Sequence, residues 1–401
     1  MNTIQAHRSF YAEFIVKLSG QDDERLIAAF SSVPREDYLG PGPWPVSVAS
    51  GYIPTLSAEP YLLYQDTLIG LATDRRINNG QPSLHAECLA AAAPRLGETV
   101  VHIGAGTGYY TAILATLVGP TGHVHALEIE PDLASRAAAN LAHFANVEVR
   151  AESANDAVLP TADLIYVNAG ATHPPSAWLD SLNVGGRLLI PLTPNEGLGV
   201  MLKITRVSAT DYAAEGIAGV AFIPCIGARD DAASASLICA LQRQSLEAIR
   251  SLRRHSQPDS TVWCAGSDWW LSTANPQSGT LTPRSTGPAT ASTVSLVRGT
   301  WCIISYQAYG ARLRRPVSSN VSHHWVTRVA SSRRSFKQPV GGAAPWSRFG
   351  IAVATGFASC PSFTGLAFFV PSLTTQRTCR PRPGKPGTTR TRAAWRYSRR
   401  R

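Results

Sequence analysis

Acidic residues are missing from the last third of this 401-residue chain. Asp268 is the last acid, and residues 276–401 carry 18 Arg and 2 Lys without an Asp or Glu. Residues 1–275 therefore hold 17 basic against 27 acidic residues, a net charge of −10, although the whole chain carries +10. A segment of that length can bury a full core, and its mild acidity is typical of a soluble enzyme.

The acid-free segment 276–401 is rich in Ser, Thr, Pro, Gly and Arg and shows no sustained helical or strand period. Clustered Arg could bind nucleic-acid phosphates. The 28 uncharged residues between Arg348 and Arg377 could anchor in a membrane, but Pro361 and Pro371 argue against that. A third interpretation, which we favour, is that the segment is no evolved domain, as after a shifted reading frame. We expect disorder, no membrane contact, and nucleic-acid binding through this segment only, if at all.

Three further absences exclude whole classes of site. The seven cysteines form no C-x-x-C pair, so neither a zinc site nor a disulfide framework is supported, and no metal is expected. Residues 1–17 contain Glu13 and no long apolar core, so a secretory signal is missing and the cytoplasm is the expected location. No Gly-Lys-Ser or Gly-Lys-Thr follows the glycine-rich turn described next, which excludes a P-loop.

What the chain does have is half of a nucleotide-binding βαβ unit. An apolar strand (100–103), a helix (109–118) and a second apolar strand ending in Glu128 follow one another. The turn between the first strand and the helix reads Gly104, Ala105, Gly106, Thr107, Gly108. Glycines let the backbone approach a ligand, and an acid about 20 residues further on lies where a ribose diol would sit. The alternative is a turn that merely joins a strand to a helix.

The rest of the first 275 residues alternates helix and strand patterns, which predicts an α/β fold with a doubly wound, mostly parallel sheet and helices on both faces. Further helices are expected at 2–19, 22–31, 82–96, 131–142, 178–182 and 230–254. Further strands are expected at 147–151, 163–168, 187–191, 201–207, 217–223 and within 262–273. Phe10, Phe14 and Leu18 are expected on the buried face of the first helix.

The turn G-x-G-x-G resembles motif I of the S-adenosylmethionine-dependent methyltransferases, where it cradles an amino-acid tail. AFSSVPREDYL (29–39) and NNGQPSLHAECL (78–89) look like signatures of the protein-L-isoaspartate O-methyltransferases. Residues 163–192 are similar to that family's strand, Ala/Gly-rich loop, Pro and Gly-Gly turn. The resemblance spans about residues 25–225. It implies a seven-strand-type methyltransferase sheet, S-adenosylmethionine as the cofactor, and methyl transfer to isoaspartyl carboxylates in damaged proteins or peptides.

Within this scheme we divide the chain into four parts. Residues 1–60 form an N-terminal cap of helices and a loop, and 61–225 form the S-adenosylmethionine-binding core. Residues 226–275 add a helix and an aromatic closing strand, and 276–401 form the basic tail. We expect the protein to be a monomer.

The resemblance also implies residues for the cofactor. The turn from Gly104 to Gly108 would hold the amino-acid tail, and Glu128 would hold the ribose. His85 matches a cofactor-side histidine of the family, although a lone helical histidine is as often an ordinary core or surface residue. Ser153 stands in Glu152-Ser153-Ala154, where the family has Gly-Asp-Gly, and could bind the adenine edge.

The acceptor side departs from the family pattern at Gly80, where the family has a Ser or Thr that helps to position the substrate carboxylate. Asn79 or Gln81 could orient that carboxylate instead, and Asn168 either touches substrate or caps its loop. A carboxylate is already deprotonated at pH 7, so orientation matters more than a base, and we assign no catalytic residue. Two alternatives stay open: a methyltransferase for another small or peptide acceptor, and a non-catalytic cofactor-binding module.

Overall fold

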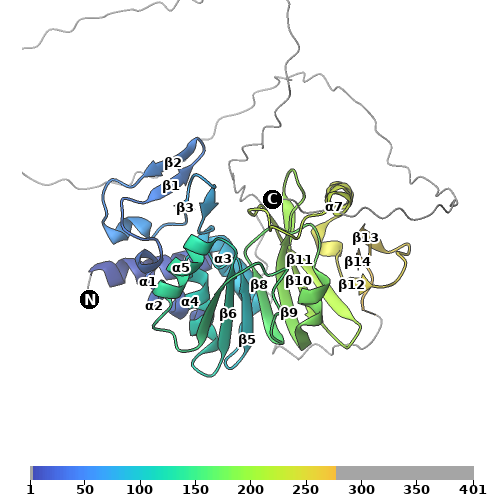
Figure 1. Cartoon of the computed structure of the whole chain (residues 1–401). Helices are drawn as coiled ribbons and strands as arrows, with labels where there is room; N and C mark the ends of the chain where they lie inside the picture. Colours follow the sequence, from blue (N-terminus) through green and yellow to red (C-terminus); the bar gives the residue numbers. More distant parts are fainter. Residues whose placement is uncertain (1–2, 277–401) are drawn as a thin grey trace, which may run out of the picture. The chain divides into compact units, whose positions relative to one another are not determined.

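The computed structural model describes residues 3–276 (Figure 1), so the expectations for the basic segment beyond residue 276 lie outside the described residues. The helices are α1 (Thr3–Leu18), α2 (Glu24–Ser32), α3 (Pro82–Ala92), α4 (Tyr109–Val118), α5 (Pro131–Asn140), α6 (Ser176–Asp180) and α7 (Asp231–Arg243), with 3-10 turns η1 (Arg35–Tyr38), η2 (Pro60–Leu63) and η3 (Leu246–Ala248). The strands are β1 (Pro45–Val48), β2 (Gly51–Pro54), β3 (Gly70–Ala72), β4 (Ile77–Asn78), β5 (Thr99–Ile103), β6 (His123–Glu128), β7 (Val147–Ala151), β8 (Ala162–Val167), β9 (Leu182–Leu192), β10 (Gly199–Arg206), β11 (Tyr212–Val220), β12 (Ser251–Arg254), β13 (Val262–Ala265) and β14 (Trp269–Ser272). Within this part of the chain, no helix combines the length and apolar content needed to cross a bilayer.

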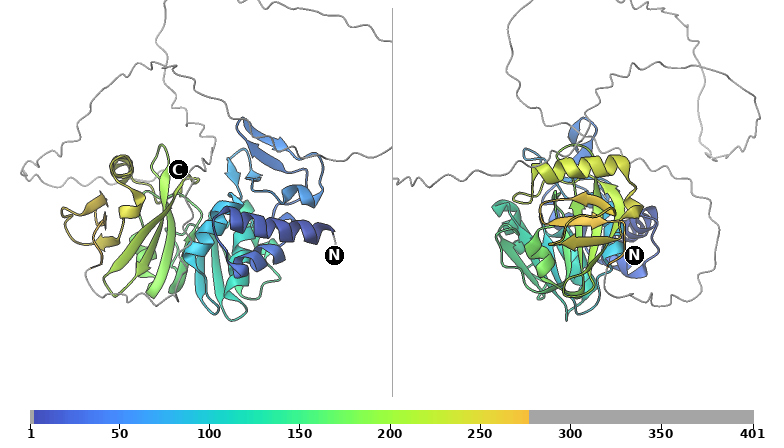
Figure 2. Two further views of the ribbon diagram at one scale, coloured as in Figure 1. Left: turned by 180° about the vertical axis from the view of Figure 1, so that it is seen from behind. Right: turned by 90° about the vertical axis from the view of Figure 1, so that its right-hand side faces the viewer.

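A ten-stranded sheet organises the described residues, in the order β13-β14-β12-β11-β10-β9-β8-β5-β6-β7. The five strands from β9 to β7 pair in parallel, which confirms the predicted α/β sheet in the half that holds the glycine-rich turn. Strands β10 to β14 extend it by antiparallel pairing, at the opposite end from the N-terminal helices (Figure 2). The chain runs from β5 outward in one direction to β7, and from β8 outward in the other. Ligands bind beside such a switch point in α/β sheets.

The central strands are buried on both faces, as their continuous apolar sequences predict. Val100 and Leu164 point into a core shared with helices α1 to α5. Their neighbours Val101 and Ile165 point into a second core, shared with α6 and α7. Helices therefore cover both faces of the sheet, as expected.

The buried face of α1 differs from the predicted one. Phe10, Phe14 and Leu18 are 70%, 44% and 49% exposed. The residues of α1 that are buried are Tyr11, Ala12, Ile15 and Val16. Two apolar stripes at helical spacing run along this helix, and contact with α2 and α3 selects the second. The prediction was wrong because spacing alone does not say which stripe meets the core.

The helix predicted over 230–254 ends at Arg243, and η3 and β12 follow it. Strand β12 pairs with both β11 and β14, so tertiary pairing overrides the helical pattern of these residues. The predicted start of this helix is confirmed, because the Asp230 carboxylate caps α7 by accepting from Ala233 N at 2.6 Å. The aromatic segment, expected to form strand, folds as a hairpin of β13 and β14 with Trp263 and Trp269 buried.

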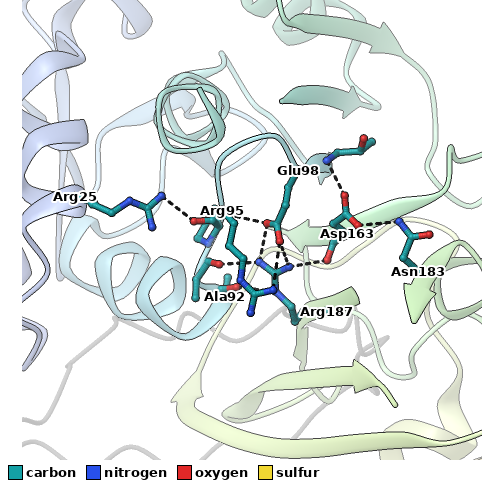
Figure 3. A network of polar contacts seen from close by, with 10 residues as sticks. Arg25, Ala92, Arg95, Glu98, Asp163, Asn183 and Arg187 are labelled. Carbon is teal, nitrogen blue, oxygen red and sulfur yellow. Dashed lines mark hydrogen bonds and ion pairs between the residues drawn. The ribbon is translucent and has the colours of Figure 1, made fainter. Parts of the chain in front are cut away.

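A buried ion pair braces the sheet at the end of β5 that lies away from the turn (Figure 3). Arg187 donates to both oxygens of Glu98, at 2.7 and 2.9 Å. It also donates to the carbonyls of Ala92, Ala93 and Asp163, at 2.9, 2.8 and 2.9 Å. All five guanidinium N–H groups therefore have an acceptor. The network joins the end of α3 to β5, β8 and β9.

Candidate functional site

The glycine-rich turn joins β5 to α4 with a backbone shape that glycine adopts readily. Gly104, Gly106 and Gly108 have φ of 76°, 57° and 96°, in the left-handed region that other residues avoid. A Cβ at Gly108 would lie 2.7 Å from the side chain of Leu141, beside the end of α5. The three glycines therefore set both the shape of the turn and the packing of α4.

The rest of the turn is braced by its neighbours. The amides of Gly104 and Ala105 donate to the carbonyl of Leu127 on β6, at 2.9 and 3.2 Å. The carbonyl of Thr107 accepts from the Asn140 side chain of α5 at 2.9 Å. Ala105 and Thr107 are both buried, so they contribute backbone to the site.

Glu128 ends β6 beside this turn. Its Oε2 accepts from Gly106 N at 2.6 Å and its Oε1 accepts from Glu130 N at 3.0 Å. The side chain is 6% exposed, and burial raises its pKa above the ordinary value of 4.5. The predicted acid and the predicted turn are thus joined by a direct hydrogen bond.

Ser153 follows β7, in which Ala151 lies in register with Glu128. The Ser153 hydroxyl accepts from Asn155 N at 3.3 Å. The loop that contains Ser153 is also held by Trp178, which donates to Ala154 O at 3.0 Å. The ends of three neighbouring parallel strands therefore carry the turn, the acid and the serine. The structure brings these predicted cofactor residues to one edge of the sheet.

Asn168 follows β8 on the other side of the turn. A Cβ at Gly104 would lie 3.4 Å from the Asn168 backbone carbon and 3.6 Å from its Cβ. The Asn168 side chain contacts His102, the buried residue of β5 that precedes Ile103 and the turn. The sequence did not single out His102, although a polar residue in an apolar strand next to a glycine-rich turn is a usable signal.

His85 lies in the core rather than on the turn. It is 2% exposed, stacks on Tyr110 with ring centroids 3.7 Å apart, and places Nδ1 2.9 Å from the Tyr166 hydroxyl. Burial lowers its pKa to about 3, so the ring is neutral. These contacts match the ordinary core histidine of the alternative interpretation. A cofactor contact through this residue stays a prediction.

The residues before α3 are held by Asp66. Gln81 Nε2 donates to Asp66 Oδ2 at 2.9 Å, and Ser83 donates to the same carboxylate through its backbone N and its hydroxyl, at 2.8 and 2.7 Å. Asn79 Oδ1 accepts from Ile69 N at 2.8 Å. Among residues 3–276, the buried Asn79 Nδ2 has no hydrogen-bond partner.

Gly80 has a φ of 75°, and a Cβ there would lie 2.3 Å from His85 Nε2. The backbone and the packing therefore both oppose the hydroxyl-bearing side chain of the family pattern.

Asp66 itself is positioned by a buried arginine to which the sequence pattern gave no role. Arg35 is fully buried and donates to the carbonyls of Leu63, Gln65 and Thr67, at 2.6, 3.0 and 2.7 Å. It thereby fixes the loop that carries Asp66. Nothing in the sequence marked Asp66, because its role depends on residues 15 and 17 positions away.

The hairpin of β3 and β4 lies over the turn. The Leu71 side chain would be 3.2 Å from a Cβ at Gly106. Arg75, in the connection between the two strands, pairs with Glu130 and with Asp132 at the start of α5. No cluster of three or more potential metal ligands occurs within residues 3–276.

The sequence is similar to curated methyltransferases. Protein-L-isoaspartate O-methyltransferase of Ignicoccus hospitalis is 35% identical over 170 residues, which are 41% of this chain and 79% of the relative. Protein-L-isoaspartate O-methyltransferase 1 of Rhodopseudomonas palustris is 32% identical over 216 residues, 53% of this chain and 80% of the relative.

Among solved structures, a Plasmodium falciparum chain described as a protein-L-isoaspartate O-methyltransferase, in complex with S-adenosyl-L-homocysteine, aligns with a TM-score of 0.44 at 20% identity. The alignment covers 54% of this chain and 97% of that one. A sequence model described as protein-L-isoaspartate(D-aspartate) O-methyltransferase matches residues 13–230. With the turn, the acid and the switch point in place, the chain belongs to the protein-L-isoaspartate(D-aspartate) O-methyltransferase family.

Proposed function

We propose that this protein transfers a methyl group from S-adenosylmethionine to the carboxylate of isoaspartyl residues in damaged proteins. The observation that carries the proposal is the row of strand ends at β5, β6 and β7, which lies inside the family-matched segment 13–230. These ends carry the turn, Glu128 and Ser153, and they lie beside the switch point where open α/β sheets bind ligands.

The residues present fit S-adenosylmethionine. Each oxygen of Glu128 accepts one backbone N–H, and a carboxylate offers about four acceptor positions, so two ribose hydroxyls can still donate to it. The turn from Gly104 to Gly108 has the backbone shape to receive the amino-acid tail, and Ser153 offers a hydroxyl toward the adenine. When bound, the cofactor supplies a methyl group activated by a positive sulfonium.

The acceptor carboxylate needs orientation rather than a base, because it is ionised at pH 7. Asn79 Nδ2 is the amide donor best suited to hold it, since its Oδ1 is already fixed by Ile69 N. The Gln81 amide already donates to Asp66, so Gln81 would contribute to acceptor binding only indirectly, by holding the start of α3. Holding nucleophile, methyl and sulfur in line supplies much of the rate in such displacements.

One observation favours a second function, methyl transfer to a different small or peptide acceptor. The backbone at Gly80 and the nearby His85 ring leave no place for the hydroxyl that the family uses toward its carboxylate. A cofactor-binding module without catalysis is the third candidate. We also propose that the protein acts as a monomer in the cytoplasm and contacts nucleic acid only through its basic segment, if at all.

The test is methyl transfer by the full-length protein to an isoaspartyl peptide, with the aspartyl peptide of the same sequence as the matched control. The proposal expects label from methyl-labelled S-adenosylmethionine in the isoaspartyl peptide only. Cofactor binding by calorimetry without transfer to that peptide would refute isoaspartyl methylation and leave the two alternatives. Absence of cofactor binding would refute all three.

A further inference from the structure

Two buried polar side chains, His102 and Thr111, and the partly buried side chain of Asn168 form a hydrogen-bonded chain beneath the glycine-rich turn. His102 Nδ1 lies 2.8 Å from Thr111 Oγ1, and His102 Nε2 lies 2.8 Å from Asn168 Nδ2. His102 and Thr111 are completely buried. We call His102, Thr111 and Asn168 the tail relay, after the amino-acid tail of the cofactor and not the basic segment 276–401.

The contacts of the relay assign a role to each of its polar atoms, with the Asn168 amide nitrogen facing His102 Nε2. An amide nitrogen only donates, so His102 Nε2 must accept, and the ring proton must lie on Nδ1 and point to Thr111. Burial lowers the His102 pKa to about 3, so the ring stays neutral and the arrangement persists across ordinary pH. With its nitrogen fixed to His102, Asn168 has one remaining polar atom, Oδ1.

Asn168 Oδ1 is buried and has no hydrogen-bond partner within residues 3–276. A buried carbonyl left unpaired is costly, and its cost is removed when a donor reaches it. The backbone of Asn168 is anchored to the last residue of β5, because its N donates to Ile103 O at 2.8 Å. The unpaired oxygen therefore belongs to a residue fixed beside Gly104, where the missing Cβ leaves space next to Asn168.

The strand order identifies the donor. The cofactor would lie across the strand ends with its adenine at β7, its ribose at β6 and its amino-acid tail at β5. Adjacent strands are about 4.8 Å apart, so the end of β8 is roughly 10 Å from the ribose site at Glu128. The ribose hydroxyls and the adenine amino group are therefore out of reach of Asn168. The remaining N–H donor of the cofactor is the ammonium of its tail.

We propose that the tail relay holds Asn168 so that its Oδ1 accepts a hydrogen bond from the ammonium group of the cofactor's amino-acid tail. The inference rests on the proposed function, in that S-adenosylmethionine is the cofactor, and it assigns Asn168 to the methyl donor rather than to the acceptor. His102 and Thr111 are positioning residues, since they act through Asn168.

Two ligands separate tail recognition from general binding. S-adenosylhomocysteine carries the ammonium, whereas 5′-methylthioadenosine has the same nucleoside without the amino-acid tail. Calorimetry on the full-length protein compares both ligands for wild type, Asn168→Ala, Asn168→Asp, His102→Leu and the double variant Asn168→Ala/His102→Leu. Asn183→Ala is the matched control, because Asn183 pairs with Asp163 in the brace at the far end of the strands (Figure 3).

Asn168→Ala should weaken S-adenosylhomocysteine binding by about 10- to 100-fold, the range for a hydrogen bond to a charged group, and leave methylthioadenosine unchanged. His102→Leu should cause a loss of the same kind, and the double variant should lose little more than the worse single variant, because the two residues form one unit. Asn168→Asp keeps an oxygen toward the ammonium and should bind S-adenosylhomocysteine at least as tightly as wild type. Asn183→Ala should change neither affinity.

Equal weakening of both ligands by Asn168→Ala would overturn the proposal, since the role would then be structural. A loss of affinity in Asn168→Asp as large as in Asn168→Ala would also overturn the proposal. It would mean that, in the wild-type protein, the Asn168 amide nitrogen faces the carboxylate of the cofactor's tail. The isosteric Asp variant keeps this second test independent of folding defects. If the Asn168 and His102 variants lose S-adenosylhomocysteine affinity as expected but the isoaspartyl peptide is not methylated, the role of the tail relay is supported and the isoaspartyl acceptor is refuted. If the wild-type protein binds neither ligand, both the tail-relay proposal and the proposed function are refuted.

Discussion

Replacing Glu128 by Gln tests the cofactor site at its best-defined contact. The substitution keeps the shape of the side chain but exchanges one carboxylate oxygen for an amide NH2. Both oxygens are in use, Oε2 with Gly106 N at 2.6 Å and Oε1 with Glu130 N at 3.0 Å. Whichever position the new NH2 takes, it faces a backbone donor and loses a hydrogen bond.

The expected magnitude follows from these contacts. A hydrogen bond to a charged group contributes about 1.5–3 kcal/mol, so losing the anion toward the ribose should weaken S-adenosylhomocysteine binding by about 10- to 100-fold. Folding stability should change by less than about 1 kcal/mol, because the neutral amide avoids the desolvation that burial imposes on the carboxylate. Isothermal calorimetry measures the first quantity and urea unfolding the second.

The pH dependence supplies a second readout. Burial raises the Glu128 pKa above 4.5, so the folded protein binds this proton more tightly than the unfolded chain does. Glu128 thus contributes stability below its unfolded pKa, and that contribution is lost as pH rises through the folded pKa. Under the proposed ribose contact, cofactor affinity has the opposite dependence, because the ribose hydroxyls would donate to the Glu128 anion. It should fall as pH drops through the raised pKa, and this fall should be absent in Glu128→Gln.

Glu148→Gln on the exposed side of β7 is the control, since its side chain is 60% exposed and pairs only with His125 among the described contacts of Glu148. It should leave both affinity and its pH dependence unchanged. If Glu128→Gln bound S-adenosylhomocysteine within about threefold of wild type, less than the smallest expected hydrogen-bond loss, the carboxylate would not be the ribose acceptor.

Three further substitutions probe the acceptor side and the scaffold. Gly80→Ser should lower the melting temperature without improving methyl transfer, because a side chain there meets His85 at a φ of 75°, a strain of about 1–3 kcal/mol. Asn79→Asp should raise KM for the isoaspartyl peptide by about tenfold or more through charge repulsion, with cofactor affinity unchanged in calorimetry. Arg187→Met should cost about 3–5 kcal/mol in urea unfolding, because Glu98 is left buried without its partner.

Two of these three substitutions have a matched control variant. Gly185→Ser has a similar φ of 86° with nothing within 4 Å of the added Cβ, so it isolates backbone strain from the clash. A Gly80→Ser protein more active than wild type would contradict the steric argument. Asn79→Asp with an unchanged KM would remove Asn79 from the acceptor site. Lys203→Met breaks the more exposed pair with Glu215 and should cost at most about 1 kcal/mol; an equal cost for Arg187→Met would show that the buried network contributes little.

That the turn, Glu128 and Ser153 lie at the ends of neighbouring strands could be predicted from sequence, because this placement depends on local order along the chain. The turn follows β5 directly, Glu128 ends β6 and Ser153 lies just after β7. Parallel strands place their carboxyl ends at one edge. The acceptor side could not be predicted in the same way. Asp66 and Arg35 act through contacts between distant segments, and no pattern in the residues around them encodes those contacts.

Two errors in the fold have the same origin. The apolar stripe of Phe10 is as regular as that of Tyr11, and only the position of α2 and α3 decides which one is buried. Residues 251–254 continue a helical pattern, but hydrogen bonding to two neighbouring strands makes them a strand. Long-range pairing, which a local pattern does not contain, decided both cases.

The antiparallel extension of the sheet sets where the catalytic domain can be cut. The family-matched segment ends at residue 230, but β11 still has β12 beside it, and β14 lies between β12 and β13. A protein shortened to the matched segment would lose Trp263, Trp269 and the other residues beyond 230 that belong to the second core, and would present β11 as an open edge available to other chains. Aggregation of such a fragment would therefore indicate that the strands β12, β14 and β13, which cover β11, are missing. Any shortened form of this enzyme should retain residues through Ser272.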